Sequence, residues 1–157
     1  MAQNIPAILP YACSIVACTV AAVSDLRTRK IPNAIPIALA VFGLAFNAFG
    51  GWRLALSAVV AGTLVLIVGT LPFSLKMIGG GDIKLVSACA CVFGLTQLLP
   101  LVIYTALAGG VLAIIMIALR RFARLDANAR VPYAVAIAGG VVWIALANTL
   151  LPKLKLV

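Results

Sequence analysis

The chain has 157 residues, of which 65% are hydrophobic, and its mean hydropathy is +1.24. A soluble domain of this length leaves about 30% of the surface of its unfolded chain in contact with water. The composition therefore excludes a water-soluble fold and indicates a single membrane domain over 1–157. With 12 Lys and Arg, 3 Asp and Glu and no His, the net charge is +9. Because the basic residues flank apolar segments, they suit anionic lipid headgroups and not nucleic acid.

Six apolar segments predict an all-α protein with six transmembrane helices and short loops. Most of them hold about 20 residues, which as a helix rise about 30 Å, the thickness of the hydrocarbon core. The fourth and fifth segments form one long apolar run, in which Thr96, Gln97 and Pro100 mark the expected turn. The expected segments are Ile5–Ser24, Ile31–Phe49, Leu54–Phe73, Asp82–Leu99, Pro100–Leu119 and Pro132–Leu151.

The basic residues predict the orientation of these segments in the membrane. No Lys or Arg precedes the first segment, so we expect it to be retained and not removed as a signal peptide. One alternate set of loops holds only Arg53, Lys153 and Lys155, and the positive-inside rule assigns it, with both termini, to the outer side. The cytoplasmic set holds the other basic residues, which are Arg27, Arg29, Lys30, Lys76, Lys84, Arg120, Arg121, Arg124 and Arg130.

The acidic residues Asp25, Asp82 and Asp126 all fall on the predicted cytoplasmic side. Asp25 is expected at the end of the first helix, and Asp82 in the loop before the fourth. Two neighbouring carboxyl groups cannot both ionise cheaply, so they share a proton. One can then act as general base on water while the other acts as general acid. This is aspartic peptidase chemistry, for which we expect neither a metal nor another cofactor.

Other interpretations of the same residues were open. Asp25 could form an ion pair with Arg27 or Arg29, Asp82 could be the N-cap of the fourth helix, and Asp126 could be a solvated surface acid. Triads that need a His base are excluded because the chain has no His. A magnesium site would need a phosphate substrate, and the three glycines before Asp82 lack the rest of a P-loop.

The four cysteines all lie inside apolar segments, and none is part of a Cys-x-x-Cys pair. Without a His to complete a zinc site, we interpret them as small buried hydrophobic residues. They are Cys13, Cys18, Cys89 and Cys91.

Three blocks of the sequence resemble motifs of type IV prepilin peptidases. The first has an aspartate, a basic stretch and Ile-Pro-Asn, the second is Gly-x-Gly-Asp followed by an apolar residue and Lys, and the third begins the last helix with Pro-Tyr. Gly-x-Gly-Asp alone also occurs in other intramembrane aspartic proteases, but the order and spacing of all three are specific. The blocks are Asp25–Asn33, Gly79–Leu85 and Val131–Gly139.

The resemblance implies a GxGD-type aspartic protease fold in the bacterial inner membrane. It implies cleavage of the short basic leader of type IV prepilins or pilin-like proteins at the cytoplasmic face, with Asp25 and Asp82 as the catalytic pair. We expect Gly79 and Gly81 to let a loop bring Asp82 toward Asp25. Supporting positions by the same match are Gly79, Gly80, Gly81, Lys84, Arg27, Ile31, Pro32, Asn33, Pro132 and Tyr133.

Within this group, Lys84 is expected to balance charge or contact a headgroup phosphate, Pro32 and Asn33 to set the start of the second helix, and Arg27 to anchor orientation. Longer relatives carry an N-terminal extension with Cys-x-x-Cys pairs that is associated with methylation of the trimmed pilin. Its absence here resembles the short form of tight-adherence (Flp-type) pili, and we expect peptidase activity without methyl transfer.

Three alternatives remain open at this stage: an archaeal-type preflagellin peptidase, a non-enzymatic scaffold of a pilus-assembly system, and a proton-coupled carrier. The position of the aspartates at the membrane rim weighs against a carrier, which needs acids near the midplane. The glycine pairs Gly109–Gly110 and Gly139–Gly140 permit close helix contact, either within one chain or between two. The oligomeric state is therefore not predicted.

Overall fold

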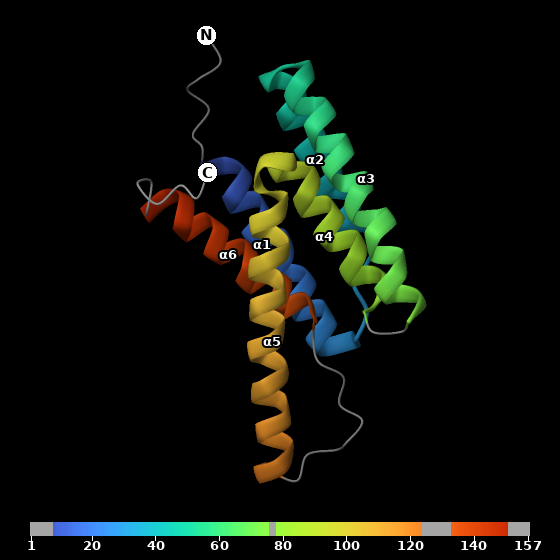
Figure 1. Cartoon of the computed structure of the whole chain (residues 1–157), viewed down its shortest axis with the longest axis vertical. Helices are drawn as coiled ribbons and strands as arrows, with labels where there is room; N and C mark the ends of the chain where they lie inside the picture. Colours follow the sequence, from blue (N-terminus) through green and yellow to red (C-terminus); the bar gives the residue numbers. More distant parts are fainter. Residues whose placement is uncertain (1–7, 76–77, 124–132, 151–157) are drawn as a thin grey trace.

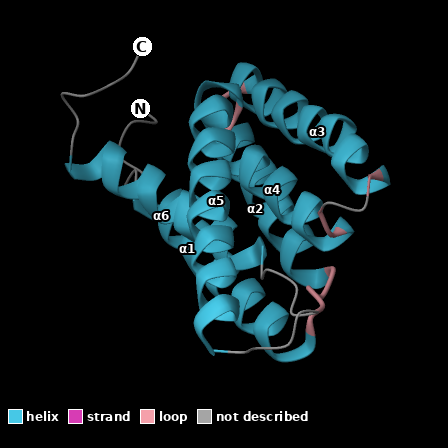
Figure 2. Ribbon diagram, turned by 60° about the horizontal axis from the view of Figure 1, so that its bottom comes forward, coloured by secondary structure: helices cyan, strands magenta, loops and turns pink. Residues whose placement is uncertain are grey.

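The computed structural model describes residues 8–75, 78–123 and 133–150 (Figure 1). Within these ranges the chain forms six α-helices and one 3₁₀ turn and has no strand, which confirms the all-α prediction (Figure 2). The elements are α1 Ile8–Thr28, α2 Ala34–Gly50, α3 Trp52–Ser74, α4 Gly80–Phe93, η1 Leu95–Gln97, α5 Leu98–Ala123 and α6 Tyr133–Leu150.

The helix boundaries correct two predictions that bear on the aspartates. The first helix continues beyond Ser24 to Thr28, so Asp25 lies within its last turns. The fourth helix begins at Gly80, so Asp82 lies in its first turn and not in a preceding loop. The first boundary was placed too early because the end of an apolar run does not mark the end of a helix. The second was placed too late because a run of three glycines, a residue with low helix propensity, was taken for a loop.

The turn expected between the fourth and fifth segments is confirmed by the break between α4 and α5. Gly94 has φ 67°, a left-handed conformation that glycine adopts without strain. The following backbone N–H, of Leu95, donates to Ser57 Oγ on α3 at 2.9 Å. Pro100 lies in the first turn of α5, where its missing N–H costs no helical hydrogen bond.

Three helices of the described chain are long and apolar enough to cross a membrane, spanning Ile8–Thr28, Trp52–Ser74 and Leu95–Ala118. Two others, α2 and α6, are apolar but shorter. The remaining helix, α4, has 14 residues and rises about 21 Å, less than the hydrocarbon core of about 30 Å. Membrane embedding follows from these helices, whereas six separate crossings stay a prediction.

The short helix α4 is the centre of the bundle. It contacts each of the other five α-helices, and both views place it between α3 and α5 (Figures 1 and 2). Its residues 87–92 are buried without interruption. The outer helices instead present large apolar side chains outward, such as Ile67 at 63% exposure and Ile114 at 68%. Lipid therefore surrounds the outer helices, while protein surrounds most of α4.

Small residues and polar side chains bring α2 and α3 close to α4. A Cβ atom on Gly43 of α2 would lie 2.7 Å from the Val92 backbone nitrogen, and one on Gly62 of α3 would collide with the Cys91 sulfur. Ser87 Oγ donates to the Gly62 carbonyl at 2.9 Å, and Asn47 Nδ2 donates to the Val92 carbonyl at 3.0 Å. These contacts fix α4 in a bundle whose helices have no hydrophobic drive to associate within lipid.

The glycine pairs of α5 and α6 are used mainly within the chain. A Cβ on Gly140 would lie 2.8 Å from the Thr105 backbone nitrogen, and Gly109 and Gly139 also face the opposite helix at ordinary contact distance. Of these four glycines, Gly110 alone has nothing within 4 Å of the position of a Cβ atom. Close packing of α5 on α6 thus explains three of these four glycines.

Candidate active site

Asp25 is held where α1 ends in a left-handed turn. The Arg29 N–H donates to the Asp25 carbonyl at 2.9 Å, and Arg29 has φ 55°. This is the geometry of a left-handed helix C-cap, in which glycine is the usual residue. Two hydroxyl groups secure the turn: Ser24 Oγ donates to the Lys30 carbonyl at 2.9 Å, and Thr28 Oγ1 donates to the same carbonyl at 3.2 Å. The strained turn fixes the direction in which the chain leaves Asp25.

Asp82 is held where α4 begins. Gly79 is the N-cap residue, with φ −74° and ψ 145°, and its carbonyl accepts from the Asp82 N–H at 3.1 Å. A Cβ on Gly79 would lie 2.9 Å from Asp82 Oδ2, and a Cβ on Gly81 would lie 3.2 Å from Ile31 Cβ. None of the three glycines has a positive φ. The prediction that a loop brings Asp82 toward Asp25 is therefore wrong, because Gly80 and Gly81 belong to α4, and the glycines instead permit close packing around the carboxyl group.

The third glycine, Gly80, faces the ring of Phe73, whose Cε2 would lie 3.3 Å from an added Cβ. Phe73 is 54% exposed and lies near the end of α3. Its side chain has room to move, so this contact is less strict than the one between Gly79 and the carboxyl group.

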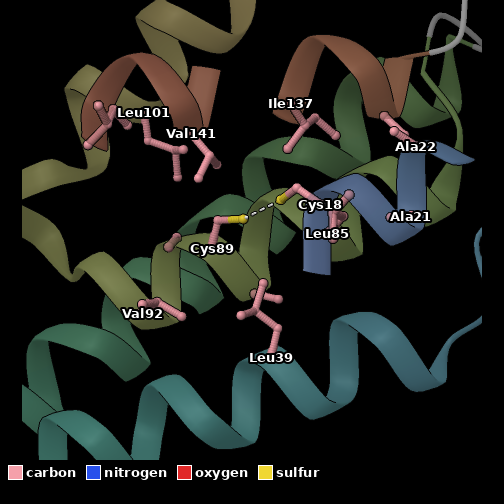
Figure 3. Packing of buried hydrophobic residues seen from close by; sticks show 14 of the residues in the cluster. Cys18, Ala21, Ala22, Leu39, Leu85, Cys89, Val92, Leu101, Ile137 and Val141 are labelled. Carbon is pink, nitrogen blue, oxygen red and sulfur yellow. Dashed lines mark hydrogen bonds between the residues drawn. The ribbon is translucent and has the colours of Figure 1, made fainter. Parts of the chain in front are cut away.

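A pair of cysteines joins the two helices that carry the aspartates. The sulfur atoms of Cys18 on α1 and Cys89 on α4 are 3.5 Å apart and buried (Figure 3). Asp25 follows Cys18 by seven residues, and Asp82 precedes Cys89 by seven. Seven residues make about two helical turns, so each aspartate lies on the same face of its helix as its cysteine. The helix contact at the cysteines thus directs both carboxyl groups toward a common site.

The two carboxyl groups interact electrostatically. Asp82 lies in the first turn of α4, outside the three candidate spans, and its Oδ1 is buried without a hydrogen-bond partner in the described chain. Burial, and next the charge of Asp25, raise the pKa of Asp82 from 3.8 to about 6, while a hydrogen bond from the Gly79 backbone opposes the rise. The surroundings of Asp82 thus disfavour the ionised form of its carboxyl group.

The structure removes two alternative interpretations of these acids. The N-cap of α4 is Gly79, so Asp82 is not the capping residue. Among the described residues, Asp25 forms no ion pair with Arg27 or Arg29. In the described chain, Asp82 is therefore not held as a helix cap, and Asp25 is not held in an ion pair with either of these arginines. Asp126 lies outside the described residues.

A further contact ties the two sequence blocks together. Lys84 Nζ donates to Asn33 Oδ1 at 3.0 Å, on the exposed side of the site. Asn33 is the N-cap residue of α2 but makes no side-chain cap hydrogen bond, because its side chain is turned to Lys84. As expected, Pro32 and Asn33 begin the helix, since their carbonyls accept from Ile35 and Ile37 N–H at 3.1 Å. Lys84 thus has a protein partner that the sequence did not predict.

Comparison with known families decides which family these blocks represent. The sequence profile of the type IV leader peptidase family matches residues 12–114, more than half of the chain. The chain belongs to this family. The matched range includes Asp25 and Asp82, whereas the third block lies beyond it. Searches among curated proteins and among solved structures returned no match.

In this leader peptidase, a cavity of about 500 Å³ adjoins Asp82 between α3, α4 and α5. Its lining is apolar except for Asp82, Thr105 and Tyr133. Tyr133, the first residue of α6, lines the same cavity as Asp82. Pro132 lies outside the described residues. No three His, Cys, Asp or Glu side chains of the described chain cluster as metal ligands would.

Several residues of the site escaped the sequence analysis. Ser24 and Thr28 secure the turn after Asp25, yet hydroxyl residues at a helix end are too common to single out. Cys18 and Cys89 could have been found, because each lies two turns from an aspartate, toward the middle of an apolar segment. The interpretation of the cysteines as small buried hydrophobic residues is confirmed for Cys18, Cys89 and Cys91, whereas Cys13 is only half-buried.

Proposed function

We propose that this member of the leader peptidase family is an aspartic endopeptidase in which Asp25 and Asp82 activate water. The observation that carries the proposal is the position of Asp82 in the first turn of α4, where one carboxyl oxygen is buried without a partner and the charge of Asp25 is close enough to raise its pKa. A peptidase that works near neutral pH needs one carboxyl group that keeps its proton. The environment of Asp82 disfavours its charged form, so we assign it as the acid and Asp25 as the base.

In the proposed mechanism, the Asp25 carboxylate takes a proton from water while the water oxygen adds to the carbonyl carbon of the scissile bond. Asp82 gives its proton to the carbonyl oxygen, which yields a neutral tetrahedral diol. Collapse of the diol breaks the C–N bond, and the amine leaves with the proton taken up by Asp25. A proton from the departing diol returns to Asp82. Water is the only co-reactant, and no covalent enzyme intermediate forms.

The proposed substrates are type IV prepilins or pilin-like proteins, cleaved at the cytoplasmic face of the bacterial inner membrane after a short basic leader. The family supports a leader peptidase. The charge asymmetry of the loops supports the cytoplasmic side, since most basic residues share the predicted side of the aspartates. The same asymmetry supports periplasmic termini.

The test is cleavage of a synthetic membrane prepilin by the purified protein in lipid nanodiscs, read by the mass of the products. Wild-type protein is expected to release the leader. Asp25→Asn and Asp82→Asn should each reduce the rate by about 10²–10⁴-fold, the usual contribution of general acid–base catalysis. Asp126→Asn, which removes the remaining acid of the chain, serves as the matched control and should be mild. Normal cleavage by either core variant would refute the dyad, and no cleavage by folded wild-type protein would favour a scaffold.

A further inference from the structure

A second cavity lies between α1 and α2, on the face of α1 opposite to Cys18 and Asp25. Its volume is about 610 Å³, and its lining is apolar except for the thiol of Cys13. It is open outward, since Val16 and Val20 line it and are 64% and 51% exposed. Positions on an α-helix advance by about 100° per residue, which places both valines about 200° from Cys18. This cavity is called the α1–α2 groove below.

The depth of the α1–α2 groove matches one leaflet of a bilayer. Its lining residues fall within 12–20 of α1 and 34–42 of α2. Each stretch rises about 12 Å as a helix, whereas the whole hydrocarbon core is about 30 Å thick and one leaflet about 15 Å. A transmembrane helix of a partner protein would extend well beyond such a groove. The acyl chain of a single lipid fits both its depth and its apolar lining.

One end of the groove lies toward the predicted cytoplasmic side. Val20 is the lining residue of α1 nearest in sequence to Asp25, and Ala34 is the first residue of α2. The two helices follow one another through residues 29–33, so these two lining residues mark the same end. The helix dipoles give this end little charge, because the negative end of α1 and the positive end of α2 offset each other. Side chains therefore set the charge there.

Basic side chains supply that charge. Arg27, Arg29 and Lys30 are exposed and form no ion pair within the described chain. Arg27 follows Val20 by seven residues, which is about two turns, so it lies on the groove face of α1. The Cα–Cβ bonds of a helix tilt toward its N-terminus, which for Arg27 is the direction of the groove. The same geometry places Arg27 about 200° from Asp25, which explains why the two do not pair.

We propose that the α1–α2 groove binds one anionic phospholipid of the cytoplasmic leaflet, with an acyl chain in the groove and the phosphate at Arg27. A guanidinium group can donate two parallel hydrogen bonds to a phosphate, which a zwitterionic lipid offers without net charge. Arg29 and Lys30 add attraction, about fivefold in affinity for each basic residue near an anionic surface. The site is separate from the aspartates and does not depend on the proposed peptidase function.

The first test compares two photoreactive lipids in nanodiscs that hold the full-length protein. Phosphatidylglycerol and phosphatidylcholine, each with a diazirine in one acyl chain, are present at equal mole fraction, and adducts are mapped by mass. The proposal expects phosphatidylglycerol to label residues 12–20 about fivefold or more above phosphatidylcholine. Equal labelling by the two lipids would overturn the proposal.

Charge variants test the headgroup contact. Arg27→Gln should lower the preference for phosphatidylglycerol by about fivefold, whereas Arg27→Lys, which keeps the charge, should retain most of it. Arg53→Gln is the matched control and should keep the full preference, because Arg53 lies in the first turn of α3, on the predicted outer side, and is placed over the Trp52 ring. An unchanged preference in Arg27→Gln would refute the contact with this residue.

Blocking variants test whether the lipid lies in the groove itself. Ala38 and Ile37 are exposed neighbours on α2, and of the two only Ala38 lines the groove. In Ala38→Trp the indole fills the groove, so labelling of residues 12–20 should lose its preference for phosphatidylglycerol. Ile37→Trp should keep it, since this side chain is outside the groove. A preference that survives in Ala38→Trp would mean that the lipid binds elsewhere.

A crosslinker on the protein identifies the occupant independently. Benzoylphenylalanine is placed at position 20, which lines the groove, and at position 19, which does not. The proposal expects adducts with phosphatidylglycerol in preference at 20 and no such preference at 19. Adducts from position 20 with a second copy of the protein would overturn the lipid site and assign the groove to self-association. No readout uses cleavage, so a failure of the peptidase proposal would leave these results unaffected.

Discussion

The two aspartates are held by helix ends of opposite kind. Asp25 lies in the last turns of α1, next to a turn built from local hydrogen bonds and a left-handed Arg29. Asp82 lies in the first turn of α4, where glycines let Ile31 approach and where one carboxyl oxygen is buried without a partner. The helix end at Asp25 is specified by groups that form hydrogen bonds. The helix end at Asp82 is specified by glycines, whose lack of side chains leaves room for close packing.

This difference bears on the acid and base roles that we propose for the two aspartates. A helix N-terminus favours a carboxylate, by at most about 1 kcal/mol at a surface site, which corresponds to less than one unit of pKa. The pKa of Asp82 nevertheless rises from 3.8 to about 6, because burial and the charge of Asp25 outweigh the opposing hydrogen bond from the Gly79 backbone. The surroundings of Asp82 therefore disfavour its ionised form, which supports the proposal that this residue is the acid.

The largest effect that tests this comparison is expected from Gly79→Ala. The backbone of Gly79 is extended, which alanine adopts freely, so only the contact 2.9 Å from Asp82 Oδ2 is changed. The carboxyl group must shift by a few tenths of an ångström, so the rate should fall, by less than the about 10²-fold that a displacement of 1 Å can cost. Gly80→Ala is the control, because its Cβ meets the movable side chain of Phe73. Equal cleavage rates for the two variants would contradict the role given to Gly79.

The second test is the dependence of the rate on pH. The acid must keep its proton, so kcat/KM should fall by about tenfold per pH unit as the pH rises well above 6. In Asp25→Asn the neighbouring charge is gone, and ¹³C NMR of labelled aspartate should show the pKa of Asp82 lower than in wild type. It should remain above 3.8, because burial is the larger cause. An unchanged pKa in this variant would mean that the carboxyl groups do not interact.

A smaller effect is expected from the hydrogen bond between Lys84 of α4 and Asn33, the N-cap residue of α2. An exposed hydrogen bond contributes about 0.5–1.5 kcal/mol, so Lys84→Ala and Asn33→Ala should each reduce kcat/KM by less than about tenfold. Because both variants remove the same contact, the double variant should be little worse than either single one. Losses that multiply in the double variant would show that the residues act separately.

The two helix ends also differ in how far the sequence predicts them. The basic stretch and Ile-Pro-Asn after Asp25 predicted a helix end, a turn and a new helix, and these are present with a shifted boundary. The end at Asp82 was misplaced because glycine has a low helix propensity, so a run of three was taken for a loop. The role of these glycines depends on Ile31, which lies next to them only in the folded chain.

The cavity beside Asp82 could not be predicted from the sequence either, because it also depends on neighbours that only folding brings together. Its walls come from α3, α4 and α5, whose apolar residues look the same in sequence whether they face lipid, protein or a cavity. The neighbours Val68 and Ile67 of α3 show this, because of the two only Val68 lines the cavity in the folded chain. The pairing of Asp25 with Asp82 was predictable because acids are rare in this chain, and a rare residue type carries more information than a common one.

The smallest effect concerns the left-handed residue beside Asp25. Arg29 has φ 55°, a conformation that costs a non-glycine residue about 1–2 kcal/mol, so Arg29→Gly should raise the melting temperature by about 2–4 °C per kcal/mol relieved. Arg27→Gly is the matched control: it removes the same charge, but from within α1, where glycine costs about 1 kcal/mol relative to good helix formers. The two variants should therefore shift the melting temperature in opposite directions in a detergent-solubilised thermal scan. Shifts of the same sign would mean that charge, and not backbone conformation, determines the stability of this helix end.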